Sequence, residues 1–237
     1  MAKISKEKFK TMHGVFDNFT ERALFKLISQ GYFDGLQSPV SIGKEANIFS
    51  AVKGDSKVII KIYRLENCDF NKMYDYIRTD PRFQGIKKSR RKVILAWAQR
   101  EFRNLILARE AGVKVPKPIT FKNNILILEF IGHNDVAPKL KDAFPDNKEK
   151  FFEKVIGYVK KLYDAGLVHG DLSEFNILNH DEKPVFIDMS QCTSLETPNS
   201  DELFERDVRN VCRFFKKIKL DKDPEKIIKK ISEERDK

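Results

Sequence analysis

The stretch His169-Gly170-Asp171-Leu172-Ser173-Glu174-Phe175-Asn176, followed by Ile187-Asp188, is the most informative part of this 237-residue sequence. Asn176 lies five residues after Asp171, and Asp188 lies twelve residues after Asn176. Phosphoryl-transfer enzymes use such a set: the first Asp accepts the proton of the attacking hydroxyl, while the Asn and the second Asp bind metal ions that neutralise phosphate charge. We therefore predict Asp171 as the catalytic base, Asn176 and Asp188 as metal ligands, and ATP with Mg²⁺ as the bound nucleotide.

The flanking residues agree with this prediction. Leu167-Val168 and Val185-Phe186-Ile187 are short apolar runs typical of buried strands, and His180-Asp181-Glu182-Lys183 predicts a turn before the second run. Such strands would bring the three polar side chains to strand ends around one cleft. The alternative is a surface loop whose Asp and Asn residues match the spacing by chance.

A nucleotide-binding lysine and its acidic partner are predicted upstream. Lys61 alternates with Ile60 and Ile62 in a β-branched run, which places it on one face of a strand. Glu101 lies within the apolar stripe of a helix expected over residues 92–111. A carboxylate buried there without a partner would be unfavourable, so we predict a salt bridge to Lys61 that positions the α- and β-phosphates. The alternative is a Glu at the edge of the stripe with its carboxylate in water.

Two further segments are predicted to contact the nucleotide. Gly43 and Lys44 lie between two predicted strands, in a turn that would cover the phosphates, although the single glycine is equally typical of an ordinary hairpin. The apolar run that begins at Ile125 predicts a buried strand leading into a hinge. The backbone of Glu129 and Ile131 would then contact the adenine edge.

Together these segments resemble the RIO family of atypical protein kinases, in particular the first of its subfamilies in an archaeal-like short form. The resemblance implies a reduced kinase fold that uses ATP with Mg²⁺, or Mn²⁺ in its place, and acts in small ribosomal subunit maturation. It also implies that Asp188 accepts the γ-phosphoryl group as an aspartyl-phosphate, so that the protein behaves partly as an ATPase. The motifs concerned are Gly43-Lys44-Glu45-Ala46-Asn47, the stretch from His169 to Asn176, and Ile187-Asp188-Met189-Ser190-Gln191. The family residues carried over are Lys61, Glu129, Ile131, Asp171, Asn176 and Asp188.

The sequence departs from ordinary protein kinases around the catalytic segment. Gly170 stands where Arg is usual, Met189-Ser190 stands where Phe-Gly would follow Asp188, and no Ala-Pro-Glu stretch comes after it. Only about fifteen residues separate Asp188 from the next predicted helix at Leu203. We therefore expect no long activation segment and little platform for an extended peptide substrate.

The predicted fold is α+β, a reduced protein-kinase-like fold of two lobes preceded by N-terminal helices. We expect a helical extension over residues 1–36 and an N-lobe over residues 37–131, built from an antiparallel sheet of five strands and the Glu101 helix. A mostly helical C-lobe is expected over residues 132–237. The polar segment 67–89 is expected to be a mobile insertion in the N-lobe.

The charge of the chain favours a polyanionic partner. Forty-five Lys and Arg against 35 Asp and Glu give a formal net charge of +10, a balance typical of proteins that bind nucleic acid. The densest basic cluster, residues 87–92, is either a solvated helix start or a contact for RNA phosphate. We expect ribosomal RNA and the pre-ribosomal small subunit as partners. Ser89 lies in this cluster, within the segment expected to be mobile, and we predict it as an autophosphorylation site.

The cysteines, histidines and apolar runs bear on the cellular location, on metal binding and on membrane association. The three cysteines show no CxxC spacing and their odd number argues against a disulfide framework, so we expect a cytoplasmic location. The four histidines, His13, His133, His169 and His180, show no metal-ligand spacing, and we expect His169 to brace its loop. No apolar run approaches the roughly eighteen residues of a membrane span, and we expect no membrane partner.

Two other functions compete with an atypical serine/threonine kinase and ATPase. A small-molecule phosphotransferase of the aminoglycoside or choline kinase type resembles the chain at His169-Gly170-Asp171 and Asn176, but such enzymes usually carry His where Ser173 stands and have a larger helical lobe. A non-catalytic RNA-binding assembly factor with a nucleotide-sensing site is the third interpretation. The intact Asp171 and Asp188 weaken it.

Overall fold

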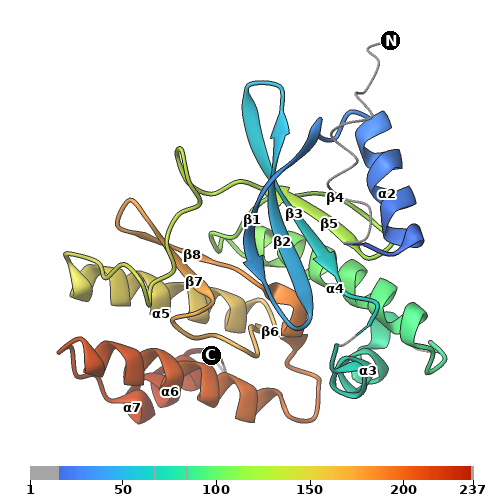
Figure 1. Cartoon of the computed structure of the whole chain (residues 1–237). Helices are drawn as coiled ribbons and strands as arrows, with labels where there is room; N and C mark the ends of the chain where they lie inside the picture. The colour runs from blue at the N-terminus through green and yellow to red at the C-terminus, as the bar shows by residue number, and fades with distance from the viewer. Residues whose placement is uncertain (1–15, 67, 84, 236–237) are drawn as a thin grey trace.

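The computed structural model, which describes residues 16–66, 68–83 and 85–235, has an N-lobe built around a sheet and a mostly helical C-lobe (Figure 1). The N-lobe contains one sheet of five antiparallel strands in the order β1-β2-β3-β5-β4. The predicted α+β fold is therefore confirmed, and the sheet starts at the first residue of β1, Gly35. The strands are β1 (Gly35–Ile42), β2 (Ala46–Lys53), β3 (Ser56–Tyr63), β4 (Pro118–Lys122) and β5 (Ile125–Glu129).

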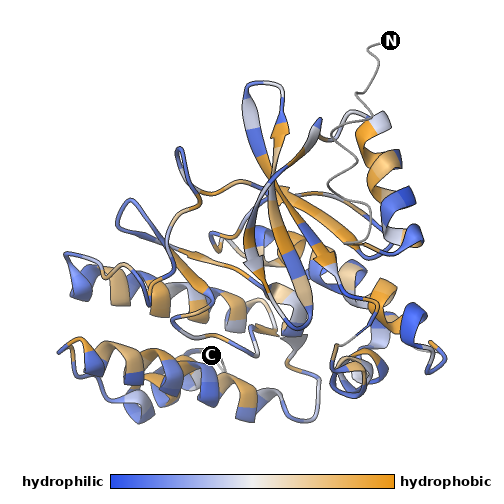
Figure 2. Cartoon of the chain, in the orientation of Figure 1, coloured by the Kyte–Doolittle hydropathy of each residue, from blue (hydrophilic) through white to orange (hydrophobic). Residues whose placement is uncertain are grey.

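Strand β3 lies at the centre of the sheet, and both of its faces are buried. Val58, Ile60 and Ile62 pack against α2 (Asn18–Ser29) on one face. Ile59 and Lys61 point to the opposite face, because successive side chains of a strand alternate between the two faces. That second face lies against α4 (Arg90–Glu110) and the C-lobe. Figure 2 shows the resulting concentration of hydrophobic residues along β3 and β5.

Helix α2 accounts for the described part of the predicted N-terminal extension; residues 1–15 lie outside the described residues. The carboxylate of Asp17 caps the helix by accepting hydrogen bonds from the N–H groups of Phe19 and Thr20, at 2.9 and 3.0 Å. Leu24 and Leu27 are buried against the sheet. The extension therefore covers the outer face of the N-lobe.

The prediction that residues 67–89 form a mobile insertion is wrong for the described residues. Helix α3 (Phe70–Thr79) and the short 3₁₀ helix η1 (Pro81–Phe83) occupy most of this segment. Met73 and Ile77, four residues apart on one face of α3, are buried against α4. The segment is polar in composition, but two apolar residues on successive turns of one face are sufficient to pack this helix.

The C-lobe is mostly helical and contains two small two-stranded sheets. The predicted turn at residues 180–183 is confirmed: Asp181 and Glu182, both with positive φ, connect β7 to β8 in a tight hairpin. The elements are α5 (Lys148–Asp164), β6 (Leu167–Val168), β7 (Ile177–His180), β8 (Lys183–Phe186), η2 (Met189–Gln191), β9 (Thr193–Ser194), α6 (Ser200–Lys217) and α7 (Pro224–Arg235). Among the described residues, no helix has both the length and the apolar character needed to cross a membrane.

Candidate functional site

A cavity of about 730 Å³ lies between the sheet of the N-lobe and the loops of the C-lobe. Its apolar walls come from both lobes and include Ile48, Ile59, Leu128 and Leu178. Its polar lining includes five predicted site residues, Lys61, Glu101, Glu129, Asn176 and Asp188. An apolar cleft with a few convergent polar groups is the usual form of a site for a small organic ligand.

Lys61 and Glu101 form the salt bridge that the sequence predicted. The ammonium of Lys61 lies 2.9 Å from Oε1 of Glu101, and the two residues are only 5 and 1% exposed. The hydroxyl of Tyr63, the last residue of β3, donates to the other carboxylate oxygen of Glu101. The charge of Glu101 is therefore buried with partners on both oxygens, which rules out the alternative of a carboxylate in water.

Asp188 receives a second hydrogen bond from the same lysine. It follows β8 in the left-handed conformation, with φ 61° and ψ 64°, which is uncommon for residues other than glycine. Its Oδ1 accepts from the Lys61 ammonium at 2.9 Å and from the Ser190 hydroxyl at 2.7 Å. The carboxylate is still 42% exposed toward the cleft.

The ionisation of Asp188 follows from these contacts. Partial burial raises the pKa of this carboxyl, but the positive charge of Lys61 and the bond from Ser190 outweigh burial and lower the pKa to about 2. A depressed carboxyl pKa contributes stability that is present above the ordinary value of about 4 and is lost only as the pH falls toward 2. Asp188 is thus an anion at any pH near neutrality.

Asp171 and Asn176 lie in the loop between β6 and β7 and contact each other. The amide nitrogen of Asn176 donates to the carbonyl oxygen of Asp171 at 2.8 Å and to its Oδ2 at 3.2 Å. Because the nitrogen is used in this way, the amide oxygen of Asn176 points elsewhere and has no protein partner among the described residues. An amide oxygen and the carboxylate of Asp188 are the hard oxygen ligands that Mg²⁺ prefers, so the donor set fits a metal nucleotide.

The loop that carries Asp171 is anchored by Asp207 of α6, whose role the sequence analysis missed. Asp207 is 2% exposed, and its two carboxylate oxygens accept from the N–H groups of Gly170 at 2.7 Å and Leu172 at 2.8 Å. Burial raises the pKa of this carboxyl to about 7, although both N–H bonds oppose the shift. The sequence did contain a signal for this role: Asp207 lies on the apolar face of an amphipathic helix, beside Phe204 and Val208, where a carboxylate needs a buried partner.

Gly170 and His169 explain two features of the motif. Gly170 has φ +78°, and a Cβ there would lie 2.8 Å from the carbonyl oxygen of Gln191, so no larger residue fits. This accounts for the glycine where ordinary kinases have Arg. The buried ring of His169 places Nε2 3.1 Å from the carbonyl oxygen of Ile187, and burial lowers its pKa. The predicted bracing role of His169 is confirmed.

Helix α4 is also bonded directly to the segment that follows Asp188. Arg100, which is fully buried, donates from Nη1 to the carbonyl oxygen of Ser190 at 2.6 Å. The amide nitrogen of Asn104 donates to the carbonyl oxygens of Met189 and Cys192, each at 2.8 Å. The helix that carries Glu101 and the turn after Asp188 therefore form one bonded unit across the two lobes.

The predicted hinge residues lie at the end of β5. Glu129 and Ile131 both line the cleft. The carboxylate of Glu129 accepts from the N–H of Lys117 at 2.9 Å, and the carbonyl of Ile131 accepts from the N–H of Ala137 at 2.8 Å. In the part of the chain that the structure describes, the N–H of Ile131 has no partner, so it is available to an adenine ring.

Four predicted site residues are not among those that line the cleft: Gly43, Lys44, Ser89 and Asp171, although Asp171 is bonded to Asn176, which does line it. Gly43 and Lys44 belong to the tight turn between β1 and β2, closed by a 3.0 Å bond from the Gly43 N–H to the carbonyl of Ala46. Their contact with a nucleotide stays a prediction. Ser89 is the exposed N-cap residue of α4 rather than part of a mobile loop, and its hydroxyl makes no capping bond.

Comparison with known proteins agrees with this geometry. The RIO domain family matches residues 47–227. The RIO-type serine/threonine-protein kinase Rio1 of Haloferax volcanii is 43% identical over 219 residues, which cover 92% of this chain and 76% of the relative. The protein of the same name from Methanocaldococcus jannaschii is 43% identical over 217 residues, covering 91% and 74%. Serine/threonine-protein kinase RIO1 of Saccharomyces cerevisiae is 34% identical over 260 residues, covering 96% and 54%.

Solved structures show the same fold. The crystal structure of the Rio2 kinase-ADP/Mg²⁺-phosphoaspartate complex from Chaetomium thermophilum superposes with a TM-score of 0.67 at 22% identity. The superposition covers 87% of this chain and 64% of that chain. The two-lobed kinase-like architecture predicted from the sequence is thereby confirmed.

Proposed function

Because this chain belongs to the RIO family of atypical protein kinases, we propose that it is an ATP- and Mg²⁺-dependent serine/threonine kinase and ATPase that acts in small ribosomal subunit maturation. The observation that supports this proposal most strongly is the continuous set of contacts across the cleft. Lys61 joins Glu101 of the N-lobe to Asp188 of the C-lobe, each at 2.9 Å. The bonded pair Asp171 and Asn176 belongs to the loop before β7.

The residues of this chain divide the chemistry among them. Lys61, fixed by Glu101, binds the α- and β-phosphates, and the N–H of Ile131 binds the adenine edge. Asp171 accepts the proton of an attacking hydroxyl at its carboxylate. Asn176 and Asp188 hold Mg²⁺, which supplies charge neutralisation on the phosphates when it is bound. The apolar walls of the cleft exclude water from the adenine ring.

The ATPase activity would use Asp188 itself. A carboxylate oxygen of Asp188 attacks the γ-phosphorus of ATP, the bond to the bridging oxygen breaks, and ADP leaves with the electron pair. Water, whose proton Asp171 accepts, then hydrolyses the aspartyl-phosphate to free phosphate and regenerates Asp188. The phosphoaspartate in the Chaetomium thermophilum Rio2 complex supports this route by similarity. The short connection from Asp188 to α6, which begins at Ser200, also leaves little surface for a peptide substrate.

The experiment that tests this function follows the γ-phosphate. The full chain is incubated with γ-labelled ATP and Mg²⁺, and phosphoprotein is separated from free phosphate. We expect both, and we expect hydroxylamine to release an acyl phosphate from Asp188 while leaving phosphoserine intact. A full chain that neither binds nor turns over ATP would refute the proposal. Turnover stimulated by an aminoglycoside or choline would favour a small-molecule kinase.

Ser89 is the predicted position of a stable phosphate. It is exposed at the start of α4, next to Lys88 and Arg90, whose charges would stabilise a phosphoserine. Because a phosphate at a helix N-terminus is also favoured by the helix dipole, modification should raise the stability of α4. Mass spectrometry after ATP incubation should find phosphate on Ser89. Modification of other serines with Ser89 unmodified would show this choice to be wrong.

Binding to ribosomal RNA should depend on the basic cluster at residues 87–92. Arg91 stacks on the ring of Phe19 at 3.5 Å, so the sharpest variant replaces only Lys87, Lys88 and Lys92 with serine. Each lost phosphate contact should reduce the slope of log affinity against log salt by about 0.9 in duplex-like RNA. Replacing the exposed lysines of α7 removes the same charge and is the matched control; these are Lys226, Lys229 and Lys230.

Titrations of structured RNA at several salt concentrations measure this effect. We expect a lower slope for the first variant, with unchanged ATP affinity, and the wild-type slope for the control. Equal slopes in the two variants would mean that net charge alone drives binding. Salt-insensitive binding would remove the RNA part of the proposal.

A further inference from the structure

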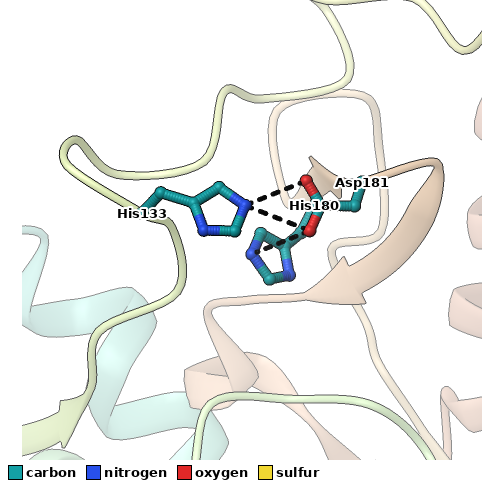
Figure 3. Close-up of side chains that lie close together, drawn as sticks. All are labelled: His133, His180 and Asp181. Carbon is teal, nitrogen blue, oxygen red and sulfur yellow. Dashed lines mark hydrogen bonds and ion pairs between the residues drawn. The ribbon is translucent and has the colours of Figure 1, made fainter.

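Three potential metal ligands meet outside the cleft (Figure 3). His133 lies in the loop that follows the hinge, and His180 and Asp181 lie at the turn between β7 and β8. The three donor atoms lie within 4.8 Å of one another. His180 and Asp181 follow His133 by 47 and 48 positions, so the spacing in the sequence does not predict the cluster. The sequence analysis had expected no metal-ligand arrangement among the histidines.

The distances within the cluster suit a small divalent ion. Nε2 of His133 lies 3.1 Å from both carboxylate oxygens of Asp181, and Nε2 of His180 lies 3.7 Å from Oδ2. A tetrahedral zinc ion has bonds of about 2.0–2.1 Å to nitrogen and oxygen, which places its ligand atoms roughly 3.4 Å apart. The observed separations lie on either side of that value. Small side-chain rotations would therefore close the site around an ion.

His180 has an unsatisfied nitrogen that points into the cluster. Its Nε2 is buried and has no hydrogen-bond partner among the described residues. A buried ring nitrogen without a partner is unfavourable, because it has lost water without gaining a bond. Nε2 of His133 lies 3.1 Å from the carboxylate of Asp181, but this contact leaves Nε2 of His180 without a hydrogen bond. A metal ion would use the nitrogens of both rings.

We propose that His133, His180 and Asp181 bind a transition-metal ion, with Zn²⁺ as the best-fitting species and water completing the coordination. Two imidazoles and one carboxylate favour Zn²⁺, Co²⁺ or Ni²⁺ over Mg²⁺, which prefers oxygen ligands. The site is distinct from the Asn176 and Asp188 pair in both position and ligand type.

An ion at this site would connect two segments that border the cleft. The loop after the hinge contributes Asn134, Asp135 and Val136 to the cleft lining. The β7–β8 hairpin begins directly after Asn176. Binding would therefore fix the loop against the hairpin and stabilise the folded chain.

The test uses the full chain without a polyhistidine tag, in excess Mg²⁺ so that the carboxylate and amide of the cleft are occupied. Competition of Zn²⁺ with a chromophoric chelator should give one ion per chain. His133→Ala, His180→Ala and Asp181→Asn should each weaken binding at least about tenfold. Asparagine tolerates the positive φ of residue 181, so the last variant preserves the turn. Asp55→Asn and Asp164→Asn each remove an exposed carboxylate outside the cluster and are the matched controls.

A second measurement covers the case in which a variant fails to fold. X-ray absorption of the wild-type chain loaded with Zn²⁺ should show two imidazoles and no sulfur ligand. Zinc should also raise the melting temperature of the wild type and of both controls, but of none of the three cluster variants. Absence of binding by the wild type, a sulfur ligand in the spectrum, or full affinity in His133→Ala and His180→Ala would each overturn the proposal.

Discussion

Replacement of Asp171 by alanine is expected to reduce turnover of ATP at least about a hundredfold, which corresponds to a loss of roughly 3 kcal/mol of transition-state stabilisation. The carboxylate would accept a proton from the attacking hydroxyl or water and would not contact the nucleotide, so the variant should still bind ATP. Asn176 loses one of its two acceptors on residue 171 but keeps the 2.8 Å bond to the carbonyl oxygen. Steady-state turnover and equilibrium nucleotide binding, measured on the same preparation, separate the two effects.

Asp188→Ala provides the comparison for this result. It removes a ligand that the proposed mechanism assigns to Mg²⁺, so Mg²⁺-dependent nucleotide binding should weaken along with turnover. The same substitution removes one of the two acceptors of the buried Lys61. If either variant turned over ATP at the wild-type rate, the roles given to Asp171 and Asp188 would be withdrawn.

Removal of Asp207 should have the largest effect on stability. Asp207→Ala leaves the buried N–H groups of Gly170 and Leu172 without an acceptor. At about 1–3 kcal/mol for each unsatisfied group, the free energy of unfolding should fall by about 2–6 kcal/mol. Turnover should fall as well, because these bonds position the loop that carries Asp171. Asp207→Asn keeps one carbonyl oxygen as an acceptor, and its loss should be about half as large.

The pH dependence of this loss has a definite sign. Burial raises the pKa of Asp207 to about 7 in the folded chain, so the folded state binds a proton more tightly than the unfolded state does. Such a group stabilises the fold at low pH, and this contribution is lost as the pH rises from about 4 toward 7. Urea unfolding should therefore give a larger deficit for Asp207→Ala at about pH 5 than at about pH 8. A deficit that grows with pH would show that the pKa of Asp207 is lowered, not raised, in the folded chain.

Local pattern was enough to predict the main features of the cleft. Alternation placed Lys61 on the inner face of its strand, and helical periodicity placed Glu101 opposite it. The spacing of Asp171, Asn176 and Asp188 predicted one site because the residues between Asn176 and Asp188 form a short hairpin, whose turn could be predicted from the sequence. These predictions need only neighbours along the chain and one pairing between elements.

Features that depend on distant contacts were missed. Helix α3 was read as a mobile insertion because its composition is polar, whereas its stability comes from two buried residues that meet α4. The anchoring bonds of Asp207 span 37 and 35 residues. His133 meets His180 and Asp181 only through the fold. In each case the partner lies on another element, and the periodicity of a single helix or strand does not predict such a contact.

The bonds from Arg100 and Asn104 to the turn after Asp188 have a pharmacological consequence. In protein kinases the position of the glutamate-bearing helix is a point of control, and a pocket behind it can open only if the helix swings away from the lysine. Here that movement would break three hydrogen bonds from α4 to backbone carbonyls. One of them is the bond from the buried guanidinium of Arg100 to the carbonyl oxygen of Ser190. Compounds selected for a displaced helix should therefore find no binding site in this protein, and selective ligands should instead exploit the shape of the cleft as it stands.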